Sequence, residues 1–405
     1  MPRVEASDIA FIQYTSGSTS KPKGVVITHE NIMANSEEIR REFDNKPGDV
    51  GVTWLPFFHD MGLIGHIIQP LYTGMLNYFL SPIRFVAQPY LWLEAISKYD
   101  GAVSGGPNFG YQLCCEKVND EQIERLDLSG WKLAYSGSEK INPVTMKDFS
   151  RRFVDCGYKS SIFYPCYGLA ESTLFVAGTK GAIKTSGLGE SEYVAVGKVS
   201  KNIKLVSPET NQIIRDGDVG EIYVKSKSIA REYYLNSLAS RAIFDQTVAG
   251  DRGYVKTGDL GFIKDSNLYF VGRIKNIIKQ NGKNFYLEDI ESIVHELTRP
   301  MLVNRCAAVG LTFDREELVI LIELKMKHFS QEAYNLIEID VSNELRTRIG
   351  IVPYAIKIVA PHSIPLTTSG KIKRDKCQEL CSKIINTVDG CITWESKVLD
   401  TETLS

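Results

Sequence analysis

The segment YTSGSTSKPKG, residues Tyr14–Gly24, decides the fold because it separates two short β-branched runs. The runs Ile9–Ile12 and Val25–Ile27 have the composition of strands, so the segment between them is predicted to be a loop in a hairpin-like setting. Its glycines let a ligand approach the backbone closely, and its amides, hydroxyls and lysines suit phosphate oxygens. No Gly-Lys-Ser/Thr leads directly into a helix, which excludes the Walker loop. Composition alone leaves both a phosphate site and a solvated turn open.

Composition bounds the class of protein. The chain has 405 residues, 43% apolar and 24% charged, which is ordinary for a globular protein with two or more cores. The formal net charge of −2 argues against nucleic acid as a partner. Polar residues interrupt the most apolar window, Ile64–Leu80, so no membrane span is expected. Residues 1–5 lack the apolar core of a signal peptide, so we expect a cytoplasmic protein. Eight scattered cysteines without Cys-x-x-Cys pairs are expected to be reduced thiols.

The hydrophobic pattern predicts an α/β protein. Units of strand, glycine turn and helix recur from Ile9 to Val176 and predict an α/β core with a largely parallel sheet. Short alternating runs between Tyr193 and Ile263 predict a smaller β-rich subdomain. Beyond about residue 277 a small α+β domain is expected. Helices are predicted at 28–43, 88–98, 143–156, 287–297 and 331–349, and the later strands at 303–311, 318–325 and 355–359, with a hairpin around Asp314.

Polar residues gather where the predicted strands end, as expected for a site at the carboxyl edge of a parallel sheet. The stretch Thr53–Gly65 is predicted to be an apolar strand that runs into a turn. The pair His59-Asp60 at the end of this strand is either an oriented base or a turn histidine packed on aromatics. Asn108 follows another strand and is either a pocket residue or a turn asparagine. Glu171 follows a third strand, and taken alone it would be a surface glutamate at a helix start.

These segments resemble those of the adenylate-forming enzymes, which include acyl-CoA synthetases, peptide-synthetase adenylation domains and fatty acyl-AMP ligases. TSGSTSKPKG, from Thr15, is similar to the ATP-phosphate loop of that superfamily. HDMGLIG, from His59, is closest to the fatty acyl-AMP ligase branch. SGGPNFGY, YGLAEST, TGD and PLTTSGK follow in the order of the superfamily, from Ser104, Tyr167, Thr257 and Pro365. In the segment Gly137–Glu139 the match is looser, since Ser138 departs from the residue usual there.

The resemblance implies a role for each matched position. Expected in catalysis are Lys371, Glu171 and His59. Expected to bind the nucleotide are Thr15, Ser16, Gly17, Ser18, Thr19, Lys23, Gly137, Ser138, Glu139, Tyr167, Gly168, Asp259 and Arg273. Glu171 and Thr15 would hold Mg²⁺, and the acyl pocket would include Asn108 and Gly106. A hinge at 272–276, with Lys275 at the pivot, would join a large domain (1–271) to a small one (277–405).

The chemistry fits these residue types. An aspartate such as Asp259 can accept hydrogen bonds from both hydroxyls of a ribose, and the ring of Tyr167 can stack on adenine. Lys371, in a flexible loop, can place a point charge on developing negative oxygen, although taken alone it would be a solvated loop lysine.

The implied reaction is ATP-dependent activation of a carboxylic acid, expected to be a long-chain fatty acid, to acyl-adenylate with release of pyrophosphate. The acyl group would then pass to the thiol of an acyl carrier protein. Two alternatives stay open: an acyl-CoA ligase, and a non-catalytic remnant that binds nucleotide or a partner.

Two departures from the family pattern motivate these alternatives. Chains of the superfamily begin well upstream of the phosphate loop, so the segment starting at Tyr14 predicts a truncated large domain with exposed apolar surface. The insertion that hinders transfer to coenzyme A in fatty acyl-AMP ligases is expected after YGLAEST, but Val176–Val196 is short.

Overall fold

The computed structural model describes residues 3–15, 22–181, 183–188, 191–280, 282–298, 303–313, 315–325, 331–367 and 370–386. The chain divides into two compact units. The large unit contains most residues up to Val271, and the small unit contains the residues from Gly272 onward.

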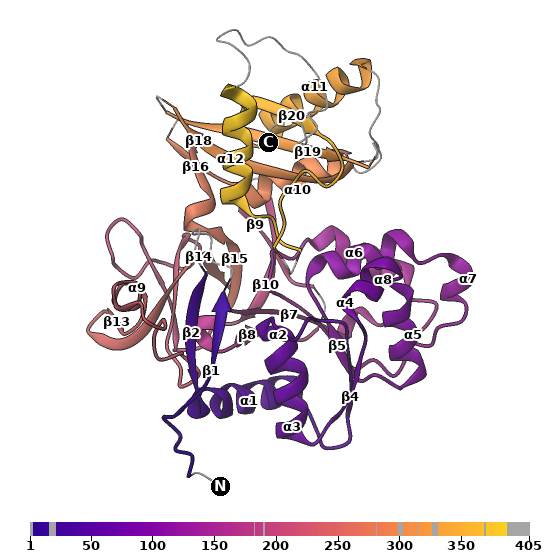
Figure 1. Ribbon diagram of the computed structural model, residues 1–405, viewed down its shortest axis with the longest axis vertical. Coiled ribbons are helices and arrows are strands. Elements are labelled where there is room, and N and C mark those ends of the chain that lie inside the picture. Colours follow the sequence, from indigo (N-terminus) through magenta and orange to yellow (C-terminus); the bar gives the residue numbers. More distant parts are fainter. Residues whose placement is uncertain are drawn as a thin grey trace. The chain divides into compact units, whose positions relative to one another are not determined.

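A six-stranded sheet forms the centre of the large unit, in the order β4-β3-β5-β6-β7-β8 (Figure 1). The first five strands are parallel, and β8 runs antiparallel to β7. The strands are β3 (Val50–Thr53), β4 (Leu76–Phe79), β5 (Val103–Gly105), β6 (Leu133–Ser136), β7 (Phe163–Gly168) and β8 (Phe175–Gly178). The prediction of an α/β core with a largely parallel sheet is confirmed.

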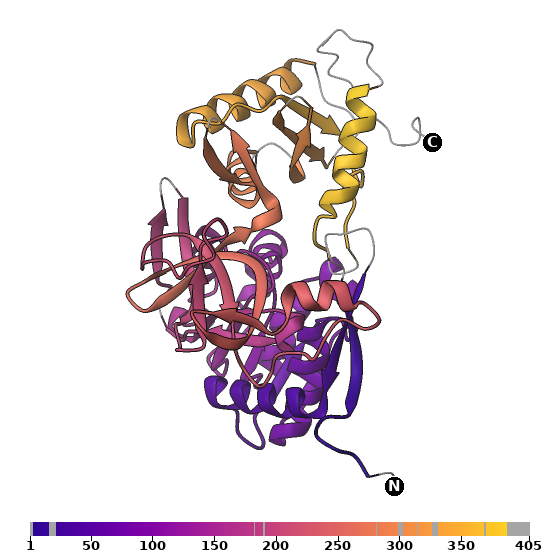
Figure 2. The same ribbon diagram turned by 90° about the vertical axis from the view of Figure 1, so that its left-hand side faces the viewer.

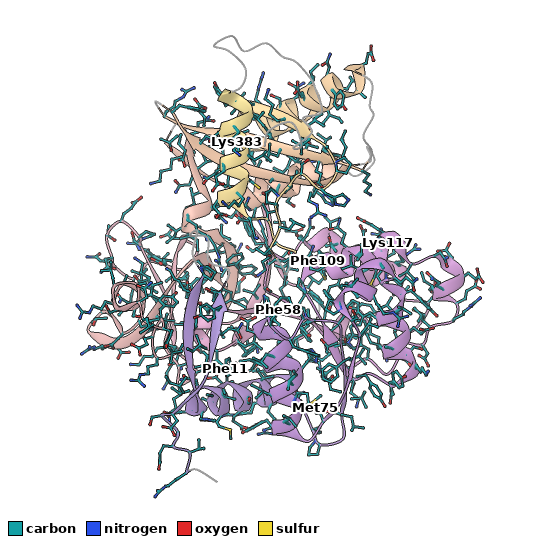
Figure 3. The ribbon with its side chains drawn as sticks, viewed as in Figure 1. Phe11, Phe58, Met75, Phe109, Lys117 and Lys383 are labelled. Carbon is teal, nitrogen blue, oxygen red and sulfur yellow. The ribbon has the colours of Figure 1, made fainter. Side chains whose placement is uncertain are left out.

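Helices cover this sheet and bury an aromatic core against it. They are α1 (His29–Phe43), α2 (Asp60–Leu63), α3 (Gln69–Thr73), α4 (Pro82–Ala87), α5 (Tyr90–Lys98), α6 (Asn108–Lys117), α7 (Asp120–Ile123) and α8 (Pro143–Arg152). Trp92, Trp131 and Phe149 are almost completely buried and meet edge to face. The indole N–H of Trp92 donates to Ser104 Oγ at 2.7 Å, which satisfies a polar atom that would otherwise be buried without a partner. Figure 3 labels Phe109 and Lys117 near the two ends of α6.

A second sheet of the large unit has the order β11-β12-β14-β15-β10-β9, with β13 beside β14. Its strands are β9 (Thr185–Leu188), β10 (Ser191–Lys198), β11 (Ile203–Val206), β12 (Gly220–Val224), β13 (Gln246–Val248), β14 (Asp251–Lys264) and β15 (Asn267–Arg273), and the helix α9 (Ser237–Ile243) precedes β13. This sheet is the β-rich subdomain predicted from the alternating runs.

The predicted hairpin is formed by β1 (Ile9–Thr15) and β2 (Lys23–Thr28), which pair antiparallel. Thr28 then caps α1, because its hydroxyl accepts from Asn31 N while the Asn31 side chain accepts from Thr28 N. The hairpin and α9 lie side by side in both ribbon views (Figure 1 and Figure 2). The paired strands therefore hold both ends of the glycine-rich loop, whose residues 16–21 lie outside the described residues.

The small unit contains a three-stranded sheet, β18-β19-β20, and a hairpin, β16-β17. Its elements are β16 (Ile277–Gln280), β17 (Lys283–Tyr286), α10 (Leu287–Thr298), β18 (Val303–Thr312), β19 (Glu316–Leu324), α11 (Gln331–Arg348), β20 (Ala355–Val359) and α12 (Arg374–Asn386). β18 and β19 pair antiparallel, as predicted, whereas Asp314 lies outside the described residues. Apolar side chains on alternate positions of β19, such as Leu318, Ile320 and Ile322, are buried against α10 and α11.

Two predicted elements end earlier than the sequence suggested. The apolar strand expected to run on from Thr53 ends at that residue, as β3, because the Thr53 hydroxyl accepts from Leu55 N and turns the chain toward Pro56. The helix expected to reach Cys156 ends at Arg152.

Large apolar side chains are exposed on and around β4, the edge strand of the parallel sheet. They are Leu71, Leu76, Tyr78, Phe79 and Ile83. Among the described residues, no helix is both long and apolar enough to cross a bilayer, and the seven cysteines in that part of the chain are free thiols.

Candidate active site

The YGLAEST segment forms a tight turn at the end of β7. Gly168 is the last residue of the strand, and a Cβ there would lie 1.8 Å from the carbonyl oxygen of Leu174, so the close return of the chain requires glycine. A 3-10 turn, Ala170–Ser172, carries Glu171. Thr173 then has φ 69° and ψ −62°, and Leu174 N donates to Ser172 O at 2.8 Å, which defines a strained γ-turn. Such strain is common where a functional side chain must be aimed.

Tyr167 and Asp259 meet although 92 residues separate them in the sequence. The Tyr167 hydroxyl donates to Asp259 Oδ2 at 2.8 Å, and both side chains are buried. The ring of Tyr167 stacks with Phe270 at a centroid distance of 6.1 Å. The large unit thus brings together two segments that the sequence analysis assigned to adenine and ribose.

A buried glutamate that the sequence analysis missed supports the TGD segment. Glu221 on β12 is 1% exposed, and its Oε1 accepts from Gly258 N at 3.0 Å, where Gly258 has φ 72°. Its Oε2 lies 3.4 Å from Lys256 Nζ. Burial raises the pKa of the Glu221 carboxyl, and Lys256 opposes that rise. The signal that could have identified Glu221 is that it is the one charged residue in the buried strand Gly220–Val224.

Glu171 and Lys23 are connected through Tyr233, which sequence reasoning also missed. The Tyr233 hydroxyl donates to Glu171 Oε1 at 2.6 Å. The Lys23 ammonium lies over the Tyr233 ring, 5.0 Å from its centroid. Two predicted groups of opposite charge are therefore held by one aromatic side chain.

The hairpin positions both ends of the predicted phosphate loop. Thr15 and Lys23 are the last pair of its ladder, and the Thr15 hydroxyl lies 3.4 Å from the Lys23 carbonyl oxygen. The predicted phosphate ligands between them, Ser16, Gly17, Ser18 and Thr19, lie outside the described residues.

The segment after β6 carries Gly137, Ser138 and Glu139. A Cβ on Gly137 would lie 2.8 Å from Cys166 O, and Ser138 has φ 73°, so the chain turns sharply beside β7. Glu139 Oε1 accepts from Phe109 N at 2.8 Å and so stabilises the first turn of α6. Contact of these residues with adenine stays a prediction.

Asn108 and Gly106, the predicted acyl-pocket residues, flank the start of α6. Asn108 is buried, and its Oδ1 accepts from Asn142 N at 2.9 Å. A Cβ on Gly106 would lie 2.6 Å from the ring of Trp54, which stacks on Phe85. The glycine therefore makes room for an aromatic wall, and an acyl chain beside it stays a prediction.

His59 is the N-cap of α2, which is the turn role that the sequence left open. Its Nδ1 lies 3.3 Å from Met61 N and 2.6 Å from Asp60 Oδ1. The adjacent Phe58, labelled in Figure 3, has its carbonyl oxygen 3.0 Å from the side-chain amide of Gln13 on β1. This contact ties the turn to the hairpin, while a catalytic role for His59 stays a prediction.

A second histidine, His66, was not singled out by the sequence analysis. It lies in a π-helical turn, Ile64–Ile68, and its Nε2 is 2.5 Å from the Tyr135 hydroxyl. Burial lowers the pKa of His66 to about 4, so its ring is neutral at neutral pH.

In the small unit, the predicted catalytic lysine lies on a short hairpin. Thr367 N donates to Lys371 O at 2.7 Å, and Lys371 N donates to the Thr367 hydroxyl at 3.0 Å. Immediately after it, the Arg374 guanidinium bonds Glu291 on α10 at 2.5 Å and Glu288 at 3.3 Å. Burial raises the pKa of Glu291 against the opposing charge of Arg374. The base of the lysine loop is thus anchored to α10 and α12.

The predicted hinge also belongs to the small unit. Arg273 ends β15, and Lys275 lies in a 3-10 turn, Ile274–Asn276. Asn276 Nδ2 donates to Glu288 Oε1 at 2.5 Å, which connects the turn to the same acidic residue that Arg374 contacts. Roles for Arg273 in nucleotide binding and for Lys275 as a pivot stay predictions.

This arrangement has the α/β fold of the adenylate-forming enzymes. A structure from a study of fatty acyl-adenylate ligases from E. coli and L. pneumophila matches with a TM-score of 0.86 at 31% identity, covering 96% of this chain and 72% of that one. Residues 1–234 match the AMP-binding enzyme family, and the chain belongs to that family.

Two further relatives carry informative names. The medium-chain-fatty-acid–[acyl-carrier-protein] ligase TtuA of Teredinibacter turnerae is 37% identical over 404 residues, covering 92% of this chain. This chain spans 63% of the length of TtuA. The L. pneumophila fatty acyl-adenylate ligase, in complex with acyl adenylate and pyrophosphate, is 33% identical with a TM-score of 0.68, covering 94% of this chain and 71% of that one.

Proposed function

We propose that this chain activates a fatty acid with ATP, forming acyl-adenylate and pyrophosphate, and passes the acyl group to an acyl-carrier-protein thiol. The observation that carries the proposal is the contact of Tyr167 with Asp259, because two separated segments expected to bind one nucleotide meet in a single buried bond. The similarity to TtuA and to the L. pneumophila enzyme supports the choice of a fatty acid and a carrier protein.

The first step requires no protein nucleophile. A carboxylate oxygen of the fatty acid attacks the α-phosphorus, the bond from that phosphorus to the bridging oxygen breaks, and pyrophosphate leaves. The protein contributes by orientation and charge. Lys23 would neutralise the leaving pyrophosphate, Asp259 would hold the ribose hydroxyls, and Lys371 would bridge the acyl carboxylate and the α-phosphate.

The donor set fits Mg²⁺ bound together with ATP. The described residues contain no cluster of three or more His, Cys, Asp or Glu side chains that could hold a metal alone. Mg²⁺ is commonly held by one or two carboxylates together with substrate phosphates and water, which suits Glu171 as the carboxylate and the Thr15 hydroxyl as a further oxygen donor. When bound, the ion would neutralise phosphate charge, while Glu171 and Thr15 would hold it.

In the second step the thiol sulfur attacks the acyl carbonyl carbon, and AMP leaves as the thioester forms. Coenzyme A is the second candidate acceptor. It is favoured by the short connection between β8 and β10, which contains the four-residue strand β9 and little other chain. Thioester formation measured under the same conditions with a carrier protein and with coenzyme A distinguishes the two acceptors. Dominant formation of CoA thioester would reject the carrier-protein proposal.

The test of the first step measures pyrophosphate release and acyl-adenylate by mass spectrometry, with ATP and either a medium-chain or a long-chain fatty acid. We expect product from at least one acid, and loss of at least 100-fold in rate for Lys371→Ala and Glu171→Gln, as for removal of one charge-stabilising group. Surface variant Lys201→Ala serves as the control. If the chain binds ATP but releases no pyrophosphate with any acid, it is a non-catalytic nucleotide-binding chain.

A further inference from the structure

The segment from Ser226 to Tyr234, here called the bridging segment, extends the hairpin that carries the phosphate loop. Arg231 N donates to Val26 O at 3.1 Å, and Val26 N donates to Glu232 O at 2.9 Å. Tyr234 N donates to Gly24 O at 2.7 Å, one residue after Lys23. The bridging segment therefore lies along β2 as an additional antiparallel edge and follows any movement of the strand that holds Lys23.

The same segment also fixes the turn that carries Glu171. Ala230 N donates to Glu171 O at 2.8 Å, and the Thr173 hydroxyl donates to Ser228 O at 2.6 Å. These bonds hold both sides of the strained γ-turn at Thr173. The bridging segment thus contacts both β2, which carries the predicted cation Lys23, and the turn that carries the predicted metal ligand Glu171.

Tyr233 is the side chain through which this connection reaches the charged groups. It is 3% exposed, its backbone N donates to Ser240 Oγ at 2.9 Å, and its ring meets Phe244 edge to face at 5.2 Å. Its orientation is therefore set by packing. The hydroxyl bonds Glu171 Oε1 at 2.6 Å, while the ring face lies under the Lys23 ammonium.

We propose that Tyr233 is a positioning residue that presets the Glu171 carboxylate for the metal and the Lys23 ammonium for phosphate, so that the two binding events are coupled. The inference rests on the proposed function of this site. A hydrogen bond to a carboxylate fixes its rotamer, leaving further lone pairs for a cation. A cation over an aromatic face restricts the long side chain of a lysine. The hydroxyl of Tyr233 therefore holds the Glu171 carboxylate, while the face of its ring holds the Lys23 ammonium.

The test separates metal affinity from nucleotide affinity. Electron paramagnetic resonance of Mn²⁺ measures its binding with the unreactive ATP analogue AMPCPP, and calorimetry in EDTA measures metal-free AMPCPP. Tyr233→Phe removes the hydroxyl but keeps the ring, so we expect about tenfold weaker Mn²⁺ binding and unchanged metal-free binding. Tyr233→Leu removes both contacts and should also weaken metal-free AMPCPP about threefold, since Lys23 is released.

Two controls isolate the mechanism. Tyr164→Phe removes a phenol-to-glutamate bond of 3.0 Å, to Glu42, elsewhere in the large unit and should leave both affinities unchanged. In a Glu171→Gln background, Tyr233→Phe should produce no further loss of Mn²⁺ affinity, because the hydroxyl acts through that carboxylate.

The outcomes distinguish the inference from the proposed function. Mn²⁺ affinity of Tyr233→Phe within twofold of the parent, or equal loss of metal-bound and metal-free affinity, would overturn the inference even if Tyr233→Leu fails to fold. The expected pattern without acyl-adenylate formation would support the inference and reject the proposed function. A parent chain that binds no Mn²⁺·AMPCPP would overturn both.

Discussion

Glu221 is predicted to position Asp259, the expected ribose ligand, by holding the backbone of Gly258. Two substitutions separate its contributions. Glu221→Gln removes the charge but keeps an oxygen that can accept from Gly258 N. Glu221→Ala removes the acceptor and leaves the partly buried N–H of Gly258 without this partner. The comparison therefore separates the need for a hydrogen-bond acceptor from the need for a charge.

The magnitudes follow from the contacts. Loss of a buried hydrogen bond to a charged group, together with a small cavity, costs about 3 kcal/mol of unfolding free energy for Glu221→Ala. Burial raises the pKa of Glu221, with opposition from Lys256. A carboxyl whose folded-state pKa is raised contributes stability that is present below its ordinary pKa and lost as pH rises through the folded value. The charge thus carries a net cost at pH 7, and Glu221→Gln should lie within about 1 kcal/mol of the parent.

The assay combines urea unfolding, followed by tryptophan fluorescence, with the apparent KM for ATP in the pyrophosphate assay. Three of the four tryptophans of the chain, Trp54, Trp92 and Trp131, lie in the large unit, so the emission reports mainly on its unfolding. We expect the KM of Glu221→Ala to rise about tenfold, because Asp259 loses its fixed backbone, and that of Glu221→Gln to change less than threefold. Equal loss of stability in both variants, or an unchanged KM for Glu221→Ala, would refute the positioning role.

Two further predictions concern buried charge. Burial lowers the pKa of His66 to about 4, so between pH 6.5 and 4 the unfolded chain binds more protons than the folded chain. The free energy of unfolding should therefore fall by about 3 kcal/mol as the pH drops through that window. His66→Gln should flatten this dependence in urea titrations, and an unchanged slope would exclude His66 as its source. Arg374→Met leaves Glu291 and Glu288 without their cation and should destabilise the small unit by about 3–5 kcal/mol, measured by hydrogen exchange on α10. Adding Glu291→Leu should restore most of that loss, and no restoration would show that the ion pair is not its cause.

The sequence was sufficient for the inner strands β5, β6 and β7 because each is a short buried run that ends in glycine or serine. The hairpin around the phosphate loop was predicted for the same reason, and β1 and β2 pair as expected. The prediction of a strand that runs on from Thr53 was wrong, because the apolar side chains that follow Thr53 pack in a turn, where periodicity gives no information. The edge strand β4 carries exposed apolar residues, so its burial pattern differs from that of the inner strands.

The contacts made by the supporting residues of the site could not be predicted, because their partners are distant in sequence. Tyr233 is 62 residues from Glu171, and Glu221 is 37 residues from Gly258. Neither lies in a motif that sequence spacing could interpret, and both act through contacts that exist only after the second sheet has packed. Tyr167 and Asp259 were both selected, but their direct hydrogen bond is a property of the fold.

The central claim is that the carboxylate of a fatty acid attacks the α-phosphorus of ATP. The most direct measurement uses a fatty acid labelled with ¹⁸O in both carboxylate oxygens, with a carrier-protein thiol as acceptor, and determines the label in the products by mass spectrometry. The account predicts one ¹⁸O atom in AMP and none in pyrophosphate. Label in orthophosphate or pyrophosphate, or unlabelled AMP alongside thioester, would contradict it.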